Sequence, residues 1–384
     1  MTAAPHLTLD PFAAGHRRPD EPDDTRAAMR AAGPIVRLEA PAGGPVWIIT
    51  DDAVARAALV HPDIVKDPAF APAGWDARTA GLEPTAAQRS SLTTSDGAEH
   101  TRLRRAHAPL FSARRMQAQR ETIAATAREL LGALAAGEQP VDLLADFTTR
   151  YPLTVICDLL GVPRHRIDQA AAACSRVLVG YPDGFDQAMG EFAQLAAAAL
   201  ASGPDGLAAE LRERLPAGVA DDELHYHLFG LIFAGQLTTD ATLGFLLARL
   251  LGGGHAAETT ADLVRTTLRM HPPTPFTLWR FTRAEVELAD VRLPARAPVL
   301  IDIQGINETA SDANGHDLAF GAGPHYCLGA QLAELELSAV VDVLRAEFPT
   351  AHLAVPYSEL VRTEPGGVMG SRLTRLPVVL RPVP

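Results

Sequence analysis

The chain has 384 residues, 47% of them hydrophobic, and its 34 basic side chains stand against 46 acidic ones, which gives a formal charge of −12. This apolar content excludes a disordered chain, and the acidic balance argues against a nucleic-acid partner, which would need a basic face. Three cysteines are too few for a disulfide scaffold, which indicates a reducing compartment.

No targeting or membrane segment is evident. The N-terminus lacks a basic start followed by an apolar stretch, so no signal peptide is predicted. The most apolar run, residues 228–235, is far shorter than the roughly 20 residues that cross a bilayer. We therefore predict a cytoplasmic protein with no membrane partner.

The first half of the chain begins with a predicted strand at residues 45–50, which are β-branched and aromatic. From about 98 to 251 the pattern is helical, with apolar residues at three- and four-residue steps in 120–136 and 185–201. Prolines predict breaks between these helices at Pro163, Pro182, Pro204 and Pro216.

The second half mixes strands and helices. A helix over 261–270 should end at His271, because the next residue is a proline. Residues 285–294 and 297–303 alternate like strands, and a loop at 320–329 opens a helix over 330–348. The predicted fold is mainly α with a smaller β region (α+β), in a single domain over 1–384 whose β-rich parts are roughly 35–60 and 275–305.

The loop at 320–329 carries the clearest chemical pattern. Gly321 and Gly323 allow a tight turn, and Cys327 precedes a helix whose amides and dipole would stabilise a thiolate. Such a thiolate is either a nucleophile, with His325 as its base, or the ligand of a metal already held by a porphyrin.

Three other interpretations of this loop compete with these two. A buried structural cysteine is the ordinary case, and it is the one that Cys157 and Cys174 receive, since both lie in apolar helices. A Gly-x-Gly phosphate loop is weak because Tyr326 occupies the third glycine position. Zinc is disfavoured because neither Cys-x-x-Cys nor His-Glu-x-x-His occurs.

This loop resembles the haem-cysteine loop of the cytochrome P450 superfamily, Phe-x-x-Gly-x-x-x-Cys-x-Gly, and residues 141–163 look like a helical stretch of its bacterial members. The resemblance implies a triangular helical body around a buried haem b (iron protoporphyrin IX), with Cys327 as the iron ligand. Cofactor contacts in the loop are then Phe320, Gly321, His325 and Gly329.

The resemblance also implies the residues that bind the haem propionates. His100 and Arg104 lie four residues apart, on one helical face, and match the family's His-x-x-x-Arg. Arg280 falls where the family has an arginine entering its β region, and His325 completes the set.

Oxygen activation is expected in the helix that contains residues 234–239, which resemble the family's Ala-Gly-x-(Asp/Glu)-Thr-Thr. Ala234 and Gly235 would contact the cofactor, and Thr238 would hydrogen-bond the bound oxygen and relay protons. Leu237 replaces the family's acid, so Gln236, Thr239 or a water chain must compensate, while Asp240 should point elsewhere. The catalytic candidates are therefore Thr238 and Thr239.

A second departure concerns the family's Glu-x-x-Arg motif, which here has Thr266 in place of the glutamate and keeps Arg269. The Pro-Glu-Arg-Phe-like segment that supplies a second partner is also missing between residues 307 and 319. We expect a local carboxylate to pair with Arg269: Asp302, Glu308 or Asp312.

Substrate contacts and electron donors are expected by similarity of position. The pocket would be lined by the loop over 70–92 and by residues on three other segments: Trp75, Phe233, Leu237, Phe276, Leu278 and Val368. A ferredoxin, reduced by its reductase, would dock on a basic patch, unless that patch is only a solvated helix face: Arg102, Arg104, Arg105, Arg114 and Arg115.

Three functions follow from these patterns. The first is O₂-dependent monooxygenation of an apolar or natural-product-like substrate in secondary metabolism. The second is oxidative coupling of aromatic side chains in a peptide or natural product, without oxygen insertion. The third is haem binding without turnover, to which the missing acid at position 237 lends some weight.

Overall fold

The computed structural model describes residues 3–81, 89–178, 184–203, 206–216, 218–255, 258–309 and 317–381. The chain divides into two compact units. Unit 1 comprises residues 1–104, 266–327 and 362–371, and unit 2 comprises 105–265, 328–361 and 372–384. The single domain expected from the sequence stays a prediction.

Unit 1 is built on a five-stranded sheet with the order β2-β3-β9-β6-β4. β3 pairs in parallel with β9, whereas the β2–β3, β9–β6 and β6–β4 pairs are antiparallel. The strands are β2 (Ile35–Glu39), β3 (Pro45–Ile49), β4 (Ile64–Val65), β6 (Arg280–Thr282) and β9 (Pro298–Ile301).

Both faces of this sheet are buried, which explains the unbroken apolar run of β3. Trp47 and Ile49 enter one apolar cluster, while Val46 and Ile48 enter another, as the two-residue period of a strand requires. α2 (Asp52–Val60) covers the first cluster with its alanines and Leu59, and its N-cap Asp51 accepts a hydrogen bond from the backbone N–H of Val54 at 3.0 Å.

Other elements of unit 1 are short. The strands β1 (Gly15–Arg17) and β11 (Arg362–Glu364) pair antiparallel, and so do β7 (Val286–Leu288) and β8 (Val291–Leu293). The helices are α1 (Asp24–Ala32), α12 (Ile303–Thr309), two 3₁₀ turns, η1 (Pro68–Phe70) and η6 (Gly323–His325), and most of α3 (Gly97–His107), which continues into unit 2.

Two features of unit 1 differ from the prediction. Residues 285–294 form a hairpin because Ala289 and Asp290 both have positive φ, 48° and 62°, which closes a two-residue turn. The β-rich part at 35–60 ends in the helix α2, which begins after the N-cap Asp51 and buries Ala55, Ala58 and Leu59.

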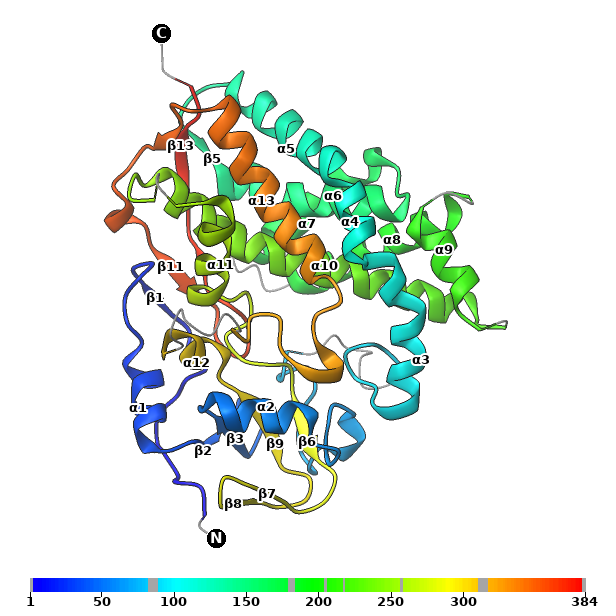
Figure 1. Ribbon diagram of the computed structural model, residues 1–384, viewed down its shortest axis with the longest axis vertical. Coiled ribbons are helices and arrows are strands. Elements are labelled where there is room, and N and C mark those ends of the chain that lie inside the picture. The colour runs from blue at the N-terminus through cyan, green and yellow to red at the C-terminus, as the bar shows by residue number, and fades with distance from the viewer. Residues whose placement is uncertain are drawn as a thin grey trace. The chain divides into compact units, whose positions relative to one another are not determined.

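Unit 2 is helical, and the long helix α10 (Asp221–Leu251) contacts α6, α8 and α13, while α13 packs along α5 (Figure 1). The prediction of helices over 98–251 and 330–348 is confirmed. Besides α10, the helices are α4 (Ala113–Ala118), α5 (Arg120–Ala135), α6 (Arg150–Leu160), α7 (Ile167–Leu178), α8 (Gly184–Ala201), α9 (Leu207–Arg214), most of α11 (Thr260–Met270) and α13 (Ala330–Glu347).

Short elements complete unit 2. A small sheet has the order β10-β13-β5, and one π-helical turn precedes α6. These elements are β5 (Val141–Asp142), β10 (His352–Leu353), β12 (Arg372–Leu373), β13 (Pro377–Val379), the π turn η3 (Leu144–Thr148) and the 3₁₀ turns η2 (Ala108–Phe111), η4 (Arg164–Arg166) and η7 (Tyr357–Glu359).

α10 corrects the sequence-based estimate of apolar length. The apolar stretch is not limited to 228–235, because α10 runs for 31 residues and is long and apolar enough to cross a membrane by length and composition. Of its most apolar window, 67% is buried inside the protein, as in the core helix of a folded domain.

Candidate functional site

The loop before Cys327 is held in a tight turn by its own backbone. The N–H of Cys327 donates to the carbonyl oxygen of Phe320 at 2.9 Å, and the N–H of Tyr326 donates to that of Gly323 at 3.0 Å. Gly323 has φ +70°, and a Cβ on it would lie 2.7 Å from Cγ1 of Val60. A glycine is therefore required for the loop to rest on the end of α2.

Cys327 differs from the other two cysteines in exposure. Cys327 is exposed, whereas Cys157 and Cys174 are buried, as predicted, and burial raises the pKa of the Cys174 thiol to about 12. Among the described residues, no group of three or more His, Cys, Asp or Glu side chains could hold a metal ion. A metal bound by Cys327 must therefore bring its remaining ligands with it.

A cluster of charged and imidazole side chains in unit 1 gathers beside this loop. The centroids of the His100 and His325 rings lie 4.0 Å apart, with the ring planes tilted by 34°, and Nε2 of His325 lies 3.2 Å from Oδ1 of Asp96. Burial raises the pKa of Asp96, but the hydrogen bonds from His325 and from the backbone N–H of Lys66 outweigh it and hold the pKa below its ordinary value. Arg280 is buried in the same cluster, at 3% exposure.

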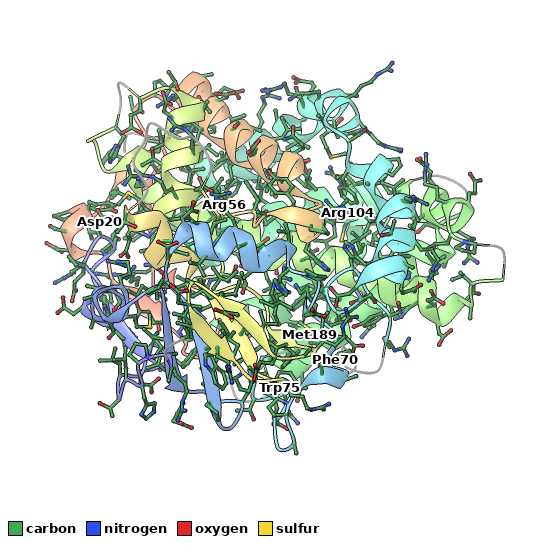
Figure 2. All side chains as sticks on the ribbon, turned by 60° about the horizontal axis from the view of Figure 1, so that its bottom comes forward. Asp20, Arg56, Phe70, Trp75, Arg104 and Met189 are labelled. Carbon is green, nitrogen blue, oxygen red and sulfur yellow. The ribbon has the colours of Figure 1, made fainter. Side chains whose placement is uncertain are left out.

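Two cations of this cluster are poorly compensated. Burial lowers the pKa of Arg280 to about 10, and Asp96 offsets only part of that effect. Arg104, on α3 (Figure 2), is half-buried, and burial lowers its pKa while the charge of Cys327 acts in the opposite direction. The predicted propionate residues of unit 1, His100, Arg104, Arg280 and His325, are thus brought together with an excess of positive charge.

Orphaned polar atoms test whether these residues fit a haem. Nε2 of His100 and Nε of Arg280 are buried without a hydrogen-bond partner in the described part of the chain. Burial, followed by the charges of His325 and Arg104, lowers the pKa of His100 to about 4, so its ring is neutral. Unused donors beside excess positive charge suit two carboxylates, so the residues present fit haem propionates.

The second candidate region is the middle of α10, in unit 2. Ala234 is exposed and Leu237 and Thr238 are half-buried, whereas Gln236 and Thr239 are buried. The spacing of Ala234 and Thr238, four residues apart, puts them on one face, and the hydroxyl of Thr238 donates to the carbonyl oxygen of Ala234 at 2.7 Å. This face of α10 is the accessible one.

Thr239 points to the opposite side, where it meets a carboxyl group that the sequence did not suggest. Its hydroxyl donates to Oε2 of Glu336, on α13, at 3.0 Å. Glu336 is 1% exposed, and burial raises its pKa well above the ordinary value, so it keeps its proton to a higher pH than an exposed glutamate does. Thr239 is therefore positioned by a buried carboxylic acid.

This proton should be visible in the pH dependence of stability. The unfolded chain loses the Glu336 proton above about pH 4.5 while the folded chain keeps it, so stability falls as pH rises from there. The slope is about 1.4 kcal/mol per pH unit until pH passes the folded pKa. Glu336→Gln keeps an acceptor for Thr239 and removes this slope. In urea unfolding, its stability relative to the unmodified chain should increase as pH rises from about 5; a constant difference contradicts the assignment.

Gln236 does not reach the accessible face of α10. Its Nε2 donates to Oδ2 of Asp240 at 3.0 Å, and Asp240 also accepts from Thr149 at 2.9 Å and pairs with Arg372. Asp240 points away from the accessible face, as predicted, and its hydrogen bond with Gln236 keeps the Gln236 side chain on the buried side as well. The suggestion that Gln236 compensates for the missing acid is therefore wrong.

Gly235 has a packing role that the sequence did not indicate, while its expected contact with the cofactor stays a prediction. A Cβ on Gly235 would lie 3.3 Å from Cγ1 of Ile156, on α6. Its missing side chain therefore allows α10 to approach α6 closely, and Gly235 is half-buried where Ala234 is exposed.

The carboxylates proposed for Arg269 are engaged elsewhere. Asp302 accepts from Arg26, and Glu308 pairs with Arg30 at 3.1 Å, so both are bound to α1. Asp312 lies outside the described residues. The expected pairing of Arg269 with Asp302 or Glu308 is thus corrected, because two arginines of α1 occupy these carboxylates.

The predicted substrate residues fall into two groups. In unit 1, Phe276 is 1% exposed between Phe12 and Arg26, and Trp75 lies edge-on to Trp279 and Phe281, near Phe70 (Figure 2). Phe276 is therefore a core residue rather than a pocket contact, since its ring has no free surface. Val368 is 7% exposed in that core, and Leu278 is half-buried.

In unit 2, Phe233 and Leu237 are both half-buried on α10. The ring of Phe233 stacks on Phe229, with centroids 6.1 Å apart, and lies edge-on to Phe192. Leu237 shares the accessible side of α10 with Thr238, where an apolar ligand can reach it.

Three residues of the site were missed from sequence: Lys66, Asp96 and Glu336. Glu336 could have been found, because it falls at an apolar position of α13, between Leu332 and Val340, where a charged residue is costly. Lys66 is also marked in the sequence, as the single lysine of the chain. Nothing in the sequence distinguished Asp96 from the other aspartates.

Comparisons with known proteins agree with this geometry. No family model matches the chain. The chain is 42% identical to the cytochrome P-450 monooxygenase DoxA of Streptomyces sp. (strain C5) over 423 residues, covering 98% of this chain and 99% of DoxA. That alignment is longer than this chain, so it contains gaps opposite residues of DoxA.

Solved structures show the same fold. CYP154A1 from Streptomyces coelicolor A3(2) superposes with a TM-score of 0.82 at 28% identity, over 98% of this chain and 100% of that one. The tirandamycin C-bound P450 monooxygenase TamI gives 0.78 at 28% identity, over 94% and 98%. With the cysteine loop and the cation cluster in place, these likenesses show that the chain belongs to the cytochrome P450 superfamily and is a haem-dependent monooxygenase of that superfamily.

Proposed function

We propose that this chain holds haem b and inserts an oxygen atom from O₂ into an apolar, natural-product-like small molecule in secondary metabolism. The observation that carries the proposal is the exposed Cys327 beside a buried cation cluster with unused donors. Haem b, which is not covalently attached, is favoured because the chain has no Cys-x-x-Cys-His.

The thiolate of Cys327 would hold the iron, and His100, Arg104, Arg280 and His325 would hold the propionates. When bound, the haem supplies the oxygen chemistry, with electron density from the thiolate favouring O–O cleavage. The chain's own residues then position the substrate and deliver protons. Leu237 and Phe233 give the accessible side of α10 an apolar surface, which suits an apolar substrate.

Proton delivery would centre on Thr238. Its hydroxyl donates to the Ala234 carbonyl, which leaves its oxygen lone pairs free to accept a proton donor from the accessible side. Leu237 cannot pass a proton, so the protons that Thr238 handles would come through a water chain on the accessible side of α10.

The substrate class rests on the relatives. The solved structure of TamI has tirandamycin C bound, and the relative DoxA comes from Streptomyces. We propose a ferredoxin and its reductase as electron donors, docking on α3 and α4 in a cytoplasmic setting. Arg102 and Arg115 are paired with Glu99 and Glu210. Arg105 and Arg114 are exposed, so these two arginines would attract an acidic ferredoxin.

A turnover experiment tests the function. The chain, a ferredoxin, its reductase, NADPH and ¹⁸O₂ are incubated with a panel of apolar natural products that includes tirandamycin C. One ¹⁸O atom in a product supports the proposal. A product that has lost two hydrogens and gained no oxygen assigns coupling instead, and no product from any compound speaks against the substrate class.

Thr238→Ala refines the same experiment. The share of electrons recovered in product should fall about tenfold, because the hydroxyl that handles the proton is gone. Haem content should not change. Thr154→Ala is the matched control, since its hydroxyl donates to the carbonyl of Arg150, also four residues earlier in a helix of unit 2, at 2.8 Å. An equal share of electrons recovered in product in both variants would contradict the role of Thr238.

A further inference from the structure

Lys66 is the single lysine among 384 residues, and the other 33 basic residues are arginines. It follows β4 directly and is 8% exposed. A buried ammonium costs several kcal/mol unless an anion accompanies it. The surroundings of this side chain therefore determine what it binds.

The sheet register places Lys66 against another cation. Ile64 pairs with Thr282 and Val65 with Phe281, so continuing the antiparallel register puts Lys66 opposite Arg280. Directly opposite residues on neighbouring strands project from the same face of the sheet, and like charges there repel. Burial and the charge of Arg280 lower the pKa of Lys66 to about 7, with Asp96 acting in the opposite direction.

Asp96 does not neutralise both cations. Its Oδ2 accepts the backbone N–H groups of Lys66 at 2.6 Å and Asp67 at 3.2 Å, and its Oδ1 faces His325. The ammonium of Lys66 has no hydrogen-bond acceptor in the described part of the chain. Two cationic side chains lie on one face of the sheet, and the one carboxylate beside them is already occupied by other donors, so a further anion there would hold Lys66 in its charged form.

The orphaned atoms show where that anion lies. Lys66 acts electrostatically on both His100 and His325, and His100 and Arg280 each have a buried nitrogen without a partner among the described residues. A ligand that satisfies these groups carries carboxylates toward β4, β6 and α3 together. We propose that Lys66 is an additional propionate-binding residue, whose ammonium forms a charged hydrogen bond with a carboxylate of the haem. This rests on the proposed function, since it presupposes bound haem.

We therefore expect Lys66 to slow the dissociation of haem from the protein. The ammonium gains its missing anion, and the propionate between Lys66 and Arg280 removes their repulsion. Lys66→Met has a similar length and no charge, so haem should dissociate roughly tenfold to a hundredfold faster when one charge-assisted hydrogen bond is lost. The haem reduction potential should also fall, because a nearby cation stabilises the more negative ferrous state.

The experiment measures transfer of haem from the ferric holoenzyme to excess apomyoglobin, together with the potential of the same samples. Lys66→Arg keeps the charge and should restore both values toward those of the unmodified chain. Arg292→Met is the control: it removes one cation from the exposed β7–β8 hairpin of the same unit, where Arg292 pairs with Glu285 at 3.4 Å. It should change neither value.

Two failures are distinguishable. Equal haem release and equal potential in Lys66→Met and the unmodified chain would overturn the role of Lys66, while the thiolate spectrum of both would remain. A chain that binds no haem at all would instead overturn the proposed function. Faster release in Lys66→Met that Lys66→Arg does not correct would assign Lys66 to packing and would likewise overturn the propionate contact.

Discussion

Cys327→Ala should reduce product formation to background, the largest effect expected of any single substitution in this chain. The methyl group offers the iron no donor, so the electron density that favours O–O cleavage is lost even where haem remains bound. The measurement is the rate of ¹⁸O incorporation per mole of haem, which separates lost chemistry from lost cofactor.

Cys157→Ala and Cys174→Ala are the matched controls for this experiment. Both cysteines are buried in helices of unit 2, at 0% and 1% exposure, and burial raises the pKa of each thiol. Their variants should keep turnover per haem. Product formation by Cys327→Ala at the rate of these controls would remove Cys327 from the mechanism.

Asp302→Ala should lower the free energy of unfolding by about 3–5 kcal/mol, because it leaves the buried guanidinium of Arg26 without its carboxylate partner. Asp302 is 0% exposed and accepts from Arg26, and its Oδ1 also accepts the backbone N–H of Gly305 at 3.1 Å. Arg26 is 4% exposed, and burial lowers its pKa to about 10. Asp23 remains near Arg26 in the variant, at 3.2 Å, but is shared with Arg17.

Urea unfolding of the haem-loaded chain measures this effect. Asp262→Ala is the control, since Asp262 pairs with Arg265 at 2.6 Å with both side chains about half exposed; such a pair contributes about 1 kcal/mol or less. The double variant Arg26→Met/Asp302→Ala should regain much of the loss, because the uncompensated charge is removed. A cost for Asp302→Ala no greater than that of the control would contradict a buried ion pair at this position.

The cysteine loop could be predicted from sequence because its determinants are contiguous. Gly321 and Gly323 have the positive φ that the turn needs, and Cys327 is the exposed cysteine. The long helices of unit 2 were equally accessible, since α5, α8 and α13 keep an apolar period over four or five turns.

Other parts of the fold depend on contacts that no local pattern reveals. α1 is a nine-residue helix whose buried side chains include Arg26, and its partner Asp302 lies 276 residues later. The turn of the β7–β8 hairpin contains Ala289 and Asp290 rather than glycine, so its positive φ angles were not signalled.

The site shows the same limit. Lys66, Asp96 and His325 come together from three separated segments, so the excess charge appears only once β4 is paired with β6. The role of Gly235 depended on Ile156, across the contact between α6 and α10. Glu336 and Thr239 likewise meet only because α10 packs on α13.

The absorption spectrum of the purified chain, reduced with dithionite under carbon monoxide, measures the iron ligand directly. A Soret band shifted to the red, typical of thiolate-bound haem, is predicted for the unmodified chain and for Lys66→Met, and it should be absent in Cys327→Ala. An unshifted band, or a protein that carries no colour after supply of haem, would contradict the assignment of Cys327 as the iron ligand.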